Sequence, residues 1–269
     1  MYPLISSLYY SFTNYTLGRT PVFVGLENFK FMFMRDPHFF QSLRATLLFV
    51  VISVPLKLIF ALMIAMMLNK AIRGIGAFRT IYYIPSILGG SVAISVLWRV
   101  LFFRNGVVNN ALASVGLPAI NFFGSPGAAL FTLSMLTVWQ FGSSMVLFLA
   151  ALKNIPQELY EAGRVDGASR LQMFFKITVP QITPIILFNT VMQTINAFQE
   201  FTSAFVITGG GPLRGTYLYG MKLYEEAFSK YKMGYACALS WLLFAIILVV
   251  TASIFRSSTK WVYYADGGD

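Results

Sequence analysis

The chain has 269 residues, of which 57% are apolar, 16% aromatic and only 11% charged. A soluble globular protein carries about 25% charged residues, so this composition excludes an ordinary water-soluble domain and indicates a polytopic membrane protein. One cysteine and one histidine exclude a disulfide framework and most histidine-based metal clusters. The net charge of +10 comes from scattered basic residues, so we expect lipid rather than nucleic acid as the surrounding partner.

The first apolar segment, residues 2–12, is too short to cross a bilayer, because about twelve helical residues reach only ~18 Å. No lysine or arginine precedes Arg19, so the segment also lacks the positive flank of a signal peptide. We expect residues 1–17 to form the outer part of a membrane helix whose beginning is missing from this chain.

Five longer segments reach the ~20 mostly apolar residues that a helix needs to cross a bilayer. They are continuously apolar and lack the alternation of outer-membrane barrel strands, which favours an all-α structure. The segments are residues 45–68, 80–103, 127–152, 184–207 and 235–255. With the partial first helix they predict a single transmembrane domain over residues 1–269.

Charge in the links between these segments indicates their orientation. The link 69–79 contains three basic residues and the link 105–126 contains none, which places the first link in the cytoplasm by the positive-inside rule. Alternation then places the link 153–183 in the cytoplasm as well. The segment 208–234, which is then outside, carries four basic residues and weakens the contrast.

The link 153–183 is long for a loop between membrane helices, and its sequence is typical of a helix. Glu158 and Glu161 lie near the expected helix start, where the helix dipole favours acids. Gly163 and Gly167 cost roughly 1 kcal/mol each relative to alanine in a helix, so a close approach to another surface is expected there. The segment is either a linker helix on the membrane surface or a docking element for a cytoplasmic partner.

The same link resembles the EAA loop of ABC-importer permeases. In chain order the matching positions are Glu161-Ala162-Gly163, three residues, Gly167, nine residues, and Ile177-Thr178-Val179-Pro180. This is the spacing of the family's E-A-A, G and I-x-L-P positions, with Gly163 in place of the third alanine and Val179 in place of the leucine. Pro156 and the run Asp166-Gly167-Ala168 are similar to the sugar-importer branch, which includes the maltose and glycerol-3-phosphate permeases.

The resemblance extends along nearly the whole chain. Residues 24–29 resemble the segment after the family's first span, and residues 79–85 resemble the entry to its third helix. Trp98 with Leu101-Phe102 resembles the end of that helix, and residues 208–212 resemble the TxGGP outer loop. The implied fold is the six-helix transmembrane domain of a type I ABC importer, in the cytoplasmic membrane of a bacterium or archaeon.

The resemblance implies a heteromeric importer of a small carbohydrate. Its other parts would be a second permease subunit, a dimer of ATPase subunits and an extracytoplasmic solute-binding protein. The chain contains no GxxxxGK[ST] phosphate-binding motif. We therefore expect no enzymatic activity and no cofactor in this chain, with ATP and Mg²⁺ bound by the partner ATPase.

In the family, the EAA helix lies in a cleft on the ATPase and transmits the closure that ATP binding causes. The resemblance implies that Glu161 is the charged anchor, that Gly167 is the position of close approach and that Pro180 ends the helix. The expected coupling residues are Glu158, Glu161, Ala162, Gly163, Asp166, Gly167, Ala168, Ile177 and Pro180.

Polar residues inside two predicted spans are candidates for contact with the substrate. Membrane-embedded polar groups tend to face a cavity or a partner helix. Asn189, Gln193, Asn196 and Glu200 have the spacing of one helical face, and amides with a carboxylate suit the hydroxyl groups of a sugar.

The other candidates are Trp139, Gln140 and Ser143, which share a side of the segment 127–152. An aromatic face suits the apolar side of a pyranose ring. By resemblance, sugar-importer permeases build their cavity from these two helices. Polar packing between helices would explain the same residues, and the roles of Lys57 and Arg99 stay open.

Other functions remain as alternatives. The same architecture is compatible with a different cargo, such as a glycerol phosphate or a polyamine. An ion-driven secondary transporter often shows internal repeats and broken helices, and the sequence shows neither. A membrane enzyme is least favoured, because one histidine, one cysteine and no carboxylate pair within a span leave little catalytic chemistry.

Overall fold

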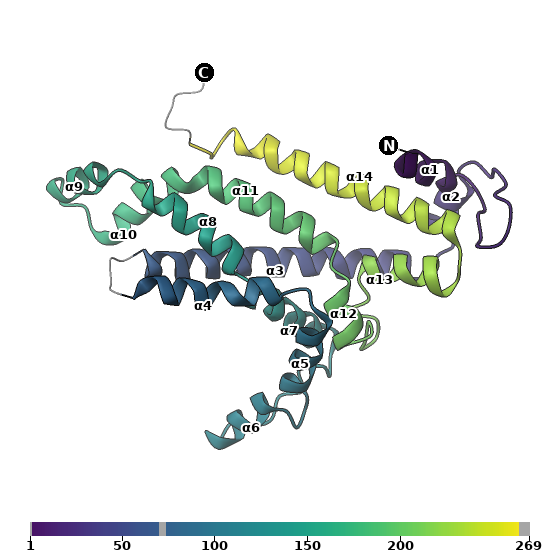
Figure 1. Ribbon diagram of the computed structural model, residues 1–269, viewed down its shortest axis with the longest axis horizontal. Coiled ribbons are helices and arrows are strands. Elements are labelled where there is room, and N and C mark those ends of the chain that lie inside the picture. Colours follow the sequence, from purple (N-terminus) through teal and green to yellow (C-terminus); the bar gives the residue numbers. More distant parts are fainter. Residues whose placement is uncertain (1, 70–73, 264–269) are drawn as a thin grey trace. The chain divides into compact units, whose positions relative to one another are not determined.

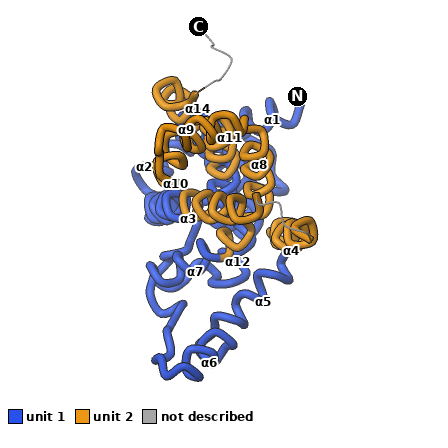
Figure 2. The backbone as a smooth tube through the Cα atoms, turned by 90° about the vertical axis from the view of Figure 1, so that its left-hand side faces the viewer, with its two compact units in different colours: residues 1–52, 90–135, 195–250 blue, residues 53–89, 136–194, 251–269 orange. Residues whose placement is uncertain are grey.

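The computed structural model describes residues 2–69 and 74–263 (Figure 1). Within these residues the regular structure is helical, apart from an isolated bridge between Thr13 and Phe23. The chain forms two compact units, which are coloured separately in Figure 2. Unit 1 contains residues 1–52, 90–135 and 195–250, and unit 2 contains residues 53–89, 136–194 and 251–269.

The helices follow one another in an order that matches the predicted alternation of spans and links. They are α1 (Tyr2–Ser11), α2 (Glu27–Met34), α3 (Phe39–Leu68), α4 (Ile75–Leu88), α5 (Val92–Phe102), α6 (Val107–Ser114), α7 (Pro126–Trp139), α8 (Gly142–Lys153), α9 (Gln157–Val165), α10 (Arg170–Met173), α11 (Val179–Phe198), α12 (Thr202–Ile207), α13 (Tyr219–Tyr224) and α14 (Met233–Ser258). Two π-helical turns, Phe174–Thr178 and Glu225–Ser229, follow α10 and α13.

Four helical runs of the described residues are long and apolar enough to cross a membrane. They are Phe39–Leu68, Val92–Ser114, Arg170–Phe198 and Met233–Ser258. The pair α7 and α8, which meet at an angle of 49°, makes a fifth if it counts as one span. The predicted segments 45–68 and 235–255 correspond to α3 and α14, both of which extend further at each end or at one end.

Three segments that we expected to be continuous helices are broken. The segment 80–103 contains α4 and α5 with a gap at Gly89-Gly90, the segment 127–152 contains α7 and α8, and the segment 184–207 contains α11 and α12. The absence of broken helices, which we used against a secondary transporter, was therefore wrong. Hydropathy records only that a segment is apolar, and polar side chains can bond the backbone groups that a break releases.

In unit 2, α4 packs closely against the break between α7 and α8. The Ser86 hydroxyl donates to the Gln140 carbonyl oxygen at 3.0 Å and accepts a hydrogen bond from the Ser143 N–H at 2.9 Å. A Cβ atom at Gly142 would lie 2.8 Å from the Tyr82 carbonyl oxygen. Glycine is therefore needed at the start of α8 for the two backbones to approach.

In unit 1, the fully buried Tyr219 connects three helices. Its N–H donates to the Thr46 hydroxyl of α3 at 2.8 Å, and its own hydroxyl donates to the Leu239 carbonyl of α14 at 2.8 Å. Its ring also meets that of Phe39 edge to face, with centroids 6.2 Å apart. These contacts fix α13 between α3 and α14 within this unit.

The close approach at Gly142 gives a stability prediction. Replacing Gly142 by Ala should destabilise the protein by about 1–3 kcal/mol, because the added methyl overlaps backbone atoms of α4. The melting temperature of the purified protein in detergent measures the effect. Gly127→Ala is the matched control, since a Cβ atom there meets no atom within 4 Å and its melting temperature should not fall. Equal melting temperatures for G142A and wild type would contradict the packing argument.

Candidate functional sites

The predicted coupling link forms a helical hairpin of unit 2, in which α9 is followed by a tight turn. The turn is a Schellman motif, because the Gly167 N–H donates to the Arg164 carbonyl at 3.1 Å and the Ala168 N–H donates to the Gly163 carbonyl at 2.9 Å. Gly167 has a φ angle of +74°, in the left-handed region that favours glycine. Gly167 is thus required by the backbone conformation that ends α9.

The second arm of the hairpin begins with a capping box. The Ser169 hydroxyl accepts a hydrogen bond from the Gln172 N–H, and the Gln172 side chain accepts one from the Ser169 N–H. The helical run then continues without a break from Arg170 to Phe198. The expectation that Pro180 ends a helix is therefore wrong. The π-helical turn Phe174–Thr178 precedes it and changes the hydrogen-bond register where the proline lacks its N–H.

Two contacts hold the arms of the hairpin together. The hydroxyl groups of Tyr160 and Thr178 are 2.8 Å apart and form a hydrogen bond. A Cβ atom at Gly163 would lie 3.1 Å from Cδ1 of Ile177, so the close approach at this glycine is to the same chain. At Gly167 no atom lies within 4 Å of such a Cβ position. Close approach of a partner at Gly167 stays a prediction.

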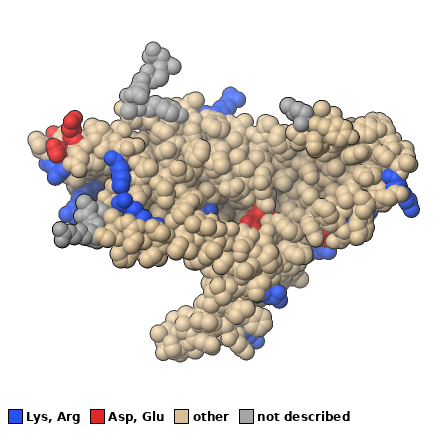
Figure 3. Space-filling model, viewed as in Figure 1, with Lys and Arg blue, Asp and Glu red and all other residues tan. Residues whose placement is uncertain are grey.

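The outer surface of the hairpin is acidic and apolar. Glu158, Glu161, Ala162 and Asp166 are exposed, and Val165 is 88% exposed. The ion pairs among the described residues include none of these acids. Figure 3 shows acidic and basic side chains gathered at the end of unit 2 that carries α9. A braced helix with unpaired acids and an exposed apolar side chain is suited to binding another protein.

The first group of predicted substrate residues lies at the break between α7 and α8. Trp139 is the last residue of α7, and Gln140 belongs to the break itself. The Gln140 side chain packs on Gly89, where an added Cβ atom would lie 2.5 Å from its Cδ atom. Ser143 is in the first turn of α8, and its N–H is bonded to Ser86. These residues therefore come together through the break rather than on one helix face.

The second group is divided along α11 and beyond it. Asn189 and Gln193 are buried, whereas Asn196 is exposed. Both polar atoms of the Asn189 amide lack a hydrogen-bond partner among the described residues. Glu200 lies past the end of α11, so placing it on the same helical face was wrong. Its Oε1 atom accepts hydrogen bonds from the N–H and the hydroxyl of Ser203, at 2.9 and 2.8 Å, and so caps α12.

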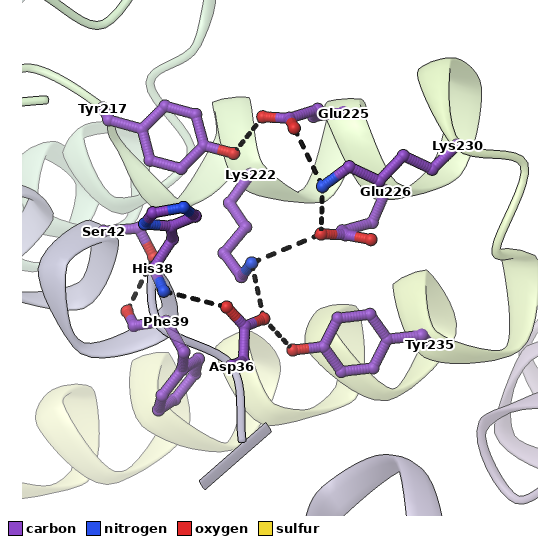
Figure 4. Close-up of polar contacts among 10 residues, drawn as sticks. All are labelled: Asp36, His38, Phe39, Ser42, Tyr217, Lys222, Glu225, Glu226, Lys230 and Tyr235. Atoms are coloured by element: carbon purple, nitrogen blue, oxygen red, sulfur yellow. Dashed lines mark hydrogen bonds and ion pairs between the residues drawn. The ribbon is translucent and has the colours of Figure 1, made fainter. Parts of the chain in front are cut away.

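A buried charge cluster in unit 1 was missed from the sequence (Figure 4). The Lys222 ammonium lies 2.6 Å from an Asp36 oxygen and 3.4 Å from a Glu226 oxygen, and the Lys222 and Asp36 side chains are 2% and 4% exposed. Lys230 lies 2.9 Å from the same Glu226 oxygen, and the Tyr235 hydroxyl donates to Asp36. The only signal in the sequence was the spacing of four between the lysines and Glu226.

The cluster changes the acidity of its carboxyl groups. Burial alone raises the pKa of Asp36, but hydrogen bonds from Lys222, Tyr235 and the His38 N–H lower it further, so the pKa lies below its ordinary value. Asp36 is thus held as a carboxylate opposite Lys222. The cluster joins the link before α3 to α13 and α14 of the same unit.

The comparisons with known proteins agree with this architecture. Residues 20–262 match the family model described as "Binding-protein-dependent transport system inner membrane component". The chain is 50% identical over 265 residues to the probable ABC transporter permease protein YesP of Bacillus subtilis (strain 168), covering 97% of this chain and 86% of the relative. It is 34% identical over 259 residues to the sulfoquinovosyl glycerol transport system permease protein SmoG of Agrobacterium fabrum, covering 95% and 84%.

A solved structure is similar as well. It is a bacterial alginate ABC transporter in complex with an alginate pentasaccharide-bound periplasmic protein, with a TM-score of 0.76, 25% identity, and coverage of 87% of this chain and 82% of that one. This chain belongs to the family of binding-protein-dependent ABC-importer permeases. It is a multi-pass membrane transport subunit rather than an enzyme, and its family works with an ATPase and a substrate-binding protein.

The charge cluster gives a second stability prediction. Asp36→Asn should destabilise the protein by about 3–5 kcal/mol, because it leaves Lys222 buried opposite a neutral side chain. The double variant Asp36→Asn with Lys222→Met should recover most of this loss, since no uncompensated charge remains. Thermal unfolding in detergent compares both with Glu27→Gln, an exposed acid of α2. A double variant as unstable as Asp36→Asn would show that the ion pair is not the cause.

Proposed function

We propose that this chain is one of two permease subunits of an importer that moves a carbohydrate across the cytoplasmic membrane by alternating access. Two similar proteins support this cargo, since one is named for sulfoquinovosyl glycerol and the other was solved with an alginate oligosaccharide. The amides of α11 and the residues at the break between α7 and α8 supply hydrogen-bonding groups and an indole face, which suit a sugar.

The coupling hairpin carries the second part of the proposal. The acids of α9 are exposed and unpaired among the described residues, while the hairpin beneath them is held by the Schellman turn, the capping box and the Tyr160–Thr178 hydrogen bond. A braced element transmits a push from a partner without bending. In this proposal the ATPase binds ATP and Mg²⁺, Glu161 pairs with a basic residue of the ATPase, and closure of the ATPase moves the hairpin.

The coupling role predicts the effect of a charge-removing variant. Glu161→Gln should reduce ATP-driven uptake by at least about tenfold, because it leaves a basic group of the partner unpaired at the interface. Uptake by proteoliposomes that contain the assembled importer is the measurement, with co-purification of the ATPase as a second readout. The control is Lys176→Gln, a charge change on the same hairpin at an exposed position. Uptake by E161Q equal to wild type, at equal expression, would refute the role of Glu161.

The cargo is tested through Asn196, which is exposed on α11 and therefore replaceable without loss of packing. Asn196→Leu should raise the KM for the transported sugar about three- to tenfold, as expected for one lost hydrogen bond. The substrate panel includes neutral oligosaccharides, glycerol 3-phosphate and a polyamine.

Thr190→Val is the matched control, because Thr190 lies on another face of α11 and bonds only to the Ile186 carbonyl of its own helix. An unchanged KM for N196L would remove Asn196 from the substrate path. Uptake of glycerol 3-phosphate or a polyamine, and of no sugar, would replace the carbohydrate cargo.

A further inference from the structure

A cavity of ≈ 700 Å³ opens in unit 2 beside the coupling hairpin. Its walls come from the end of α3, the start of α4, the end of α8 and the hairpin itself. Four basic side chains line it, Arg79, Lys153, Arg164 and Arg170, and no carboxylate does. This volume is in the usual range for a pocket that binds a small molecule.

The charges of these side chains are not neutralised within the described part of the chain. None of the ion pairs between described residues includes any of the four. Arg79 is held at the wall by one hydrogen bond, from Nη2 to the Leu68 carbonyl at 2.9 Å, while its buried Nε atom has no partner among the described residues. Arg164 donates from Nε to the Tyr160 carbonyl at 3.2 Å. Guanidinium donors therefore remain for a ligand.

The other walls of the cavity indicate the size and polarity of that ligand. Tyr160 and Gln157 add neutral hydrogen-bonding groups, and Leu152, Ile155 and Met173 add an apolar part. Arginine forks match the oxygens of a phosphate group, and an adjoining apolar wall suits an ester of that phosphate. The cavity also lies at the ends of two membrane-spanning elements, α3 and α8, where lipid headgroups are found.

We propose that this cavity binds a phosphate ester, the headgroup of an anionic phospholipid such as phosphatidylglycerol. Basic pockets between membrane helices on the cytoplasmic side recognise such headgroups, and the positive-inside rule places this link in the cytoplasm. Two of the four cations belong to the coupling hairpin, so a bound headgroup ties the hairpin to α4 and α8. The proposal is independent of which solute the importer carries.

The test uses the assembled importer in nanodiscs that contain phosphatidylglycerol and phosphatidylcholine, with bound lipid counted by native mass spectrometry. Lys153→Gln and Arg164→Gln should each weaken retention of phosphatidylglycerol about fivefold. Lys176→Gln, a basic residue of the hairpin outside the cavity, should leave retention unchanged. Arg79 is not substituted, because it also holds the Leu68 carbonyl.

A second arm separates lipid from soluble phosphate. Inorganic phosphate and glycerol 3-phosphate are titrated into the importer in phosphatidylcholine nanodiscs by calorimetry. Saturable binding of a soluble phosphate that K153Q and R164Q weaken, without retained phosphatidylglycerol, supports the phosphate site and assigns its source to the cytoplasm. Retention and binding that are the same in all variants overturn the proposal. Loss of the ATPase from K153Q and R164Q with unchanged phosphate and lipid binding also overturns it, because the cations then contact a protein.

Discussion

A backbone that crosses a bilayer must form its own hydrogen bonds, and the helix breaks of this protein depend on side chains that meet this requirement. Ser86 bonds both the carbonyl of Gln140 and the N–H of Ser143 across the break between α7 and α8. Glu200 accepts the N–H of Ser203 at the start of α12. Ser91 accepts the N–H of Ile94 at the start of α5 in the same way. Spans are therefore interrupted where a polar group compensates the backbone.

The same constraint shapes the two polar parts of the molecule that lie away from the spans. The coupling hairpin satisfies its turn with a glycine in the left-handed region and a capping box, which leaves its acids free of internal duties. The charge cluster of unit 1 does the reverse, since Asp36 and Lys222 are buried and consume each other's charge. One surface is available to partners, and the other holds a link and two helices together within its unit.

Much of the protein was predictable from local sequence. Apolar segments longer than ~20 residues gave the spans, and the spacing of Glu161, Gly167 and Pro180 gave the family. Local pattern failed for Pro180 and Glu200, because a proline is tolerated after a π-helical turn and a carboxylate near a helix end can cap the next helix. It also failed for the breaks, since hydropathy averages over the few residues where a helix turns.

The sequence by itself determined the solvent of this protein, its family and the segment that faces the ATPase, because these depend on composition and on residues close together in the chain. Only the tertiary structure decided which polar groups pair. Asp36 and Tyr235 are far apart in sequence and bond in unit 1, and Arg79, Lys153 and Arg170 line one cavity in unit 2. Such groups meet because packing of apolar helices brings them together, and no local pattern of residues encodes that meeting.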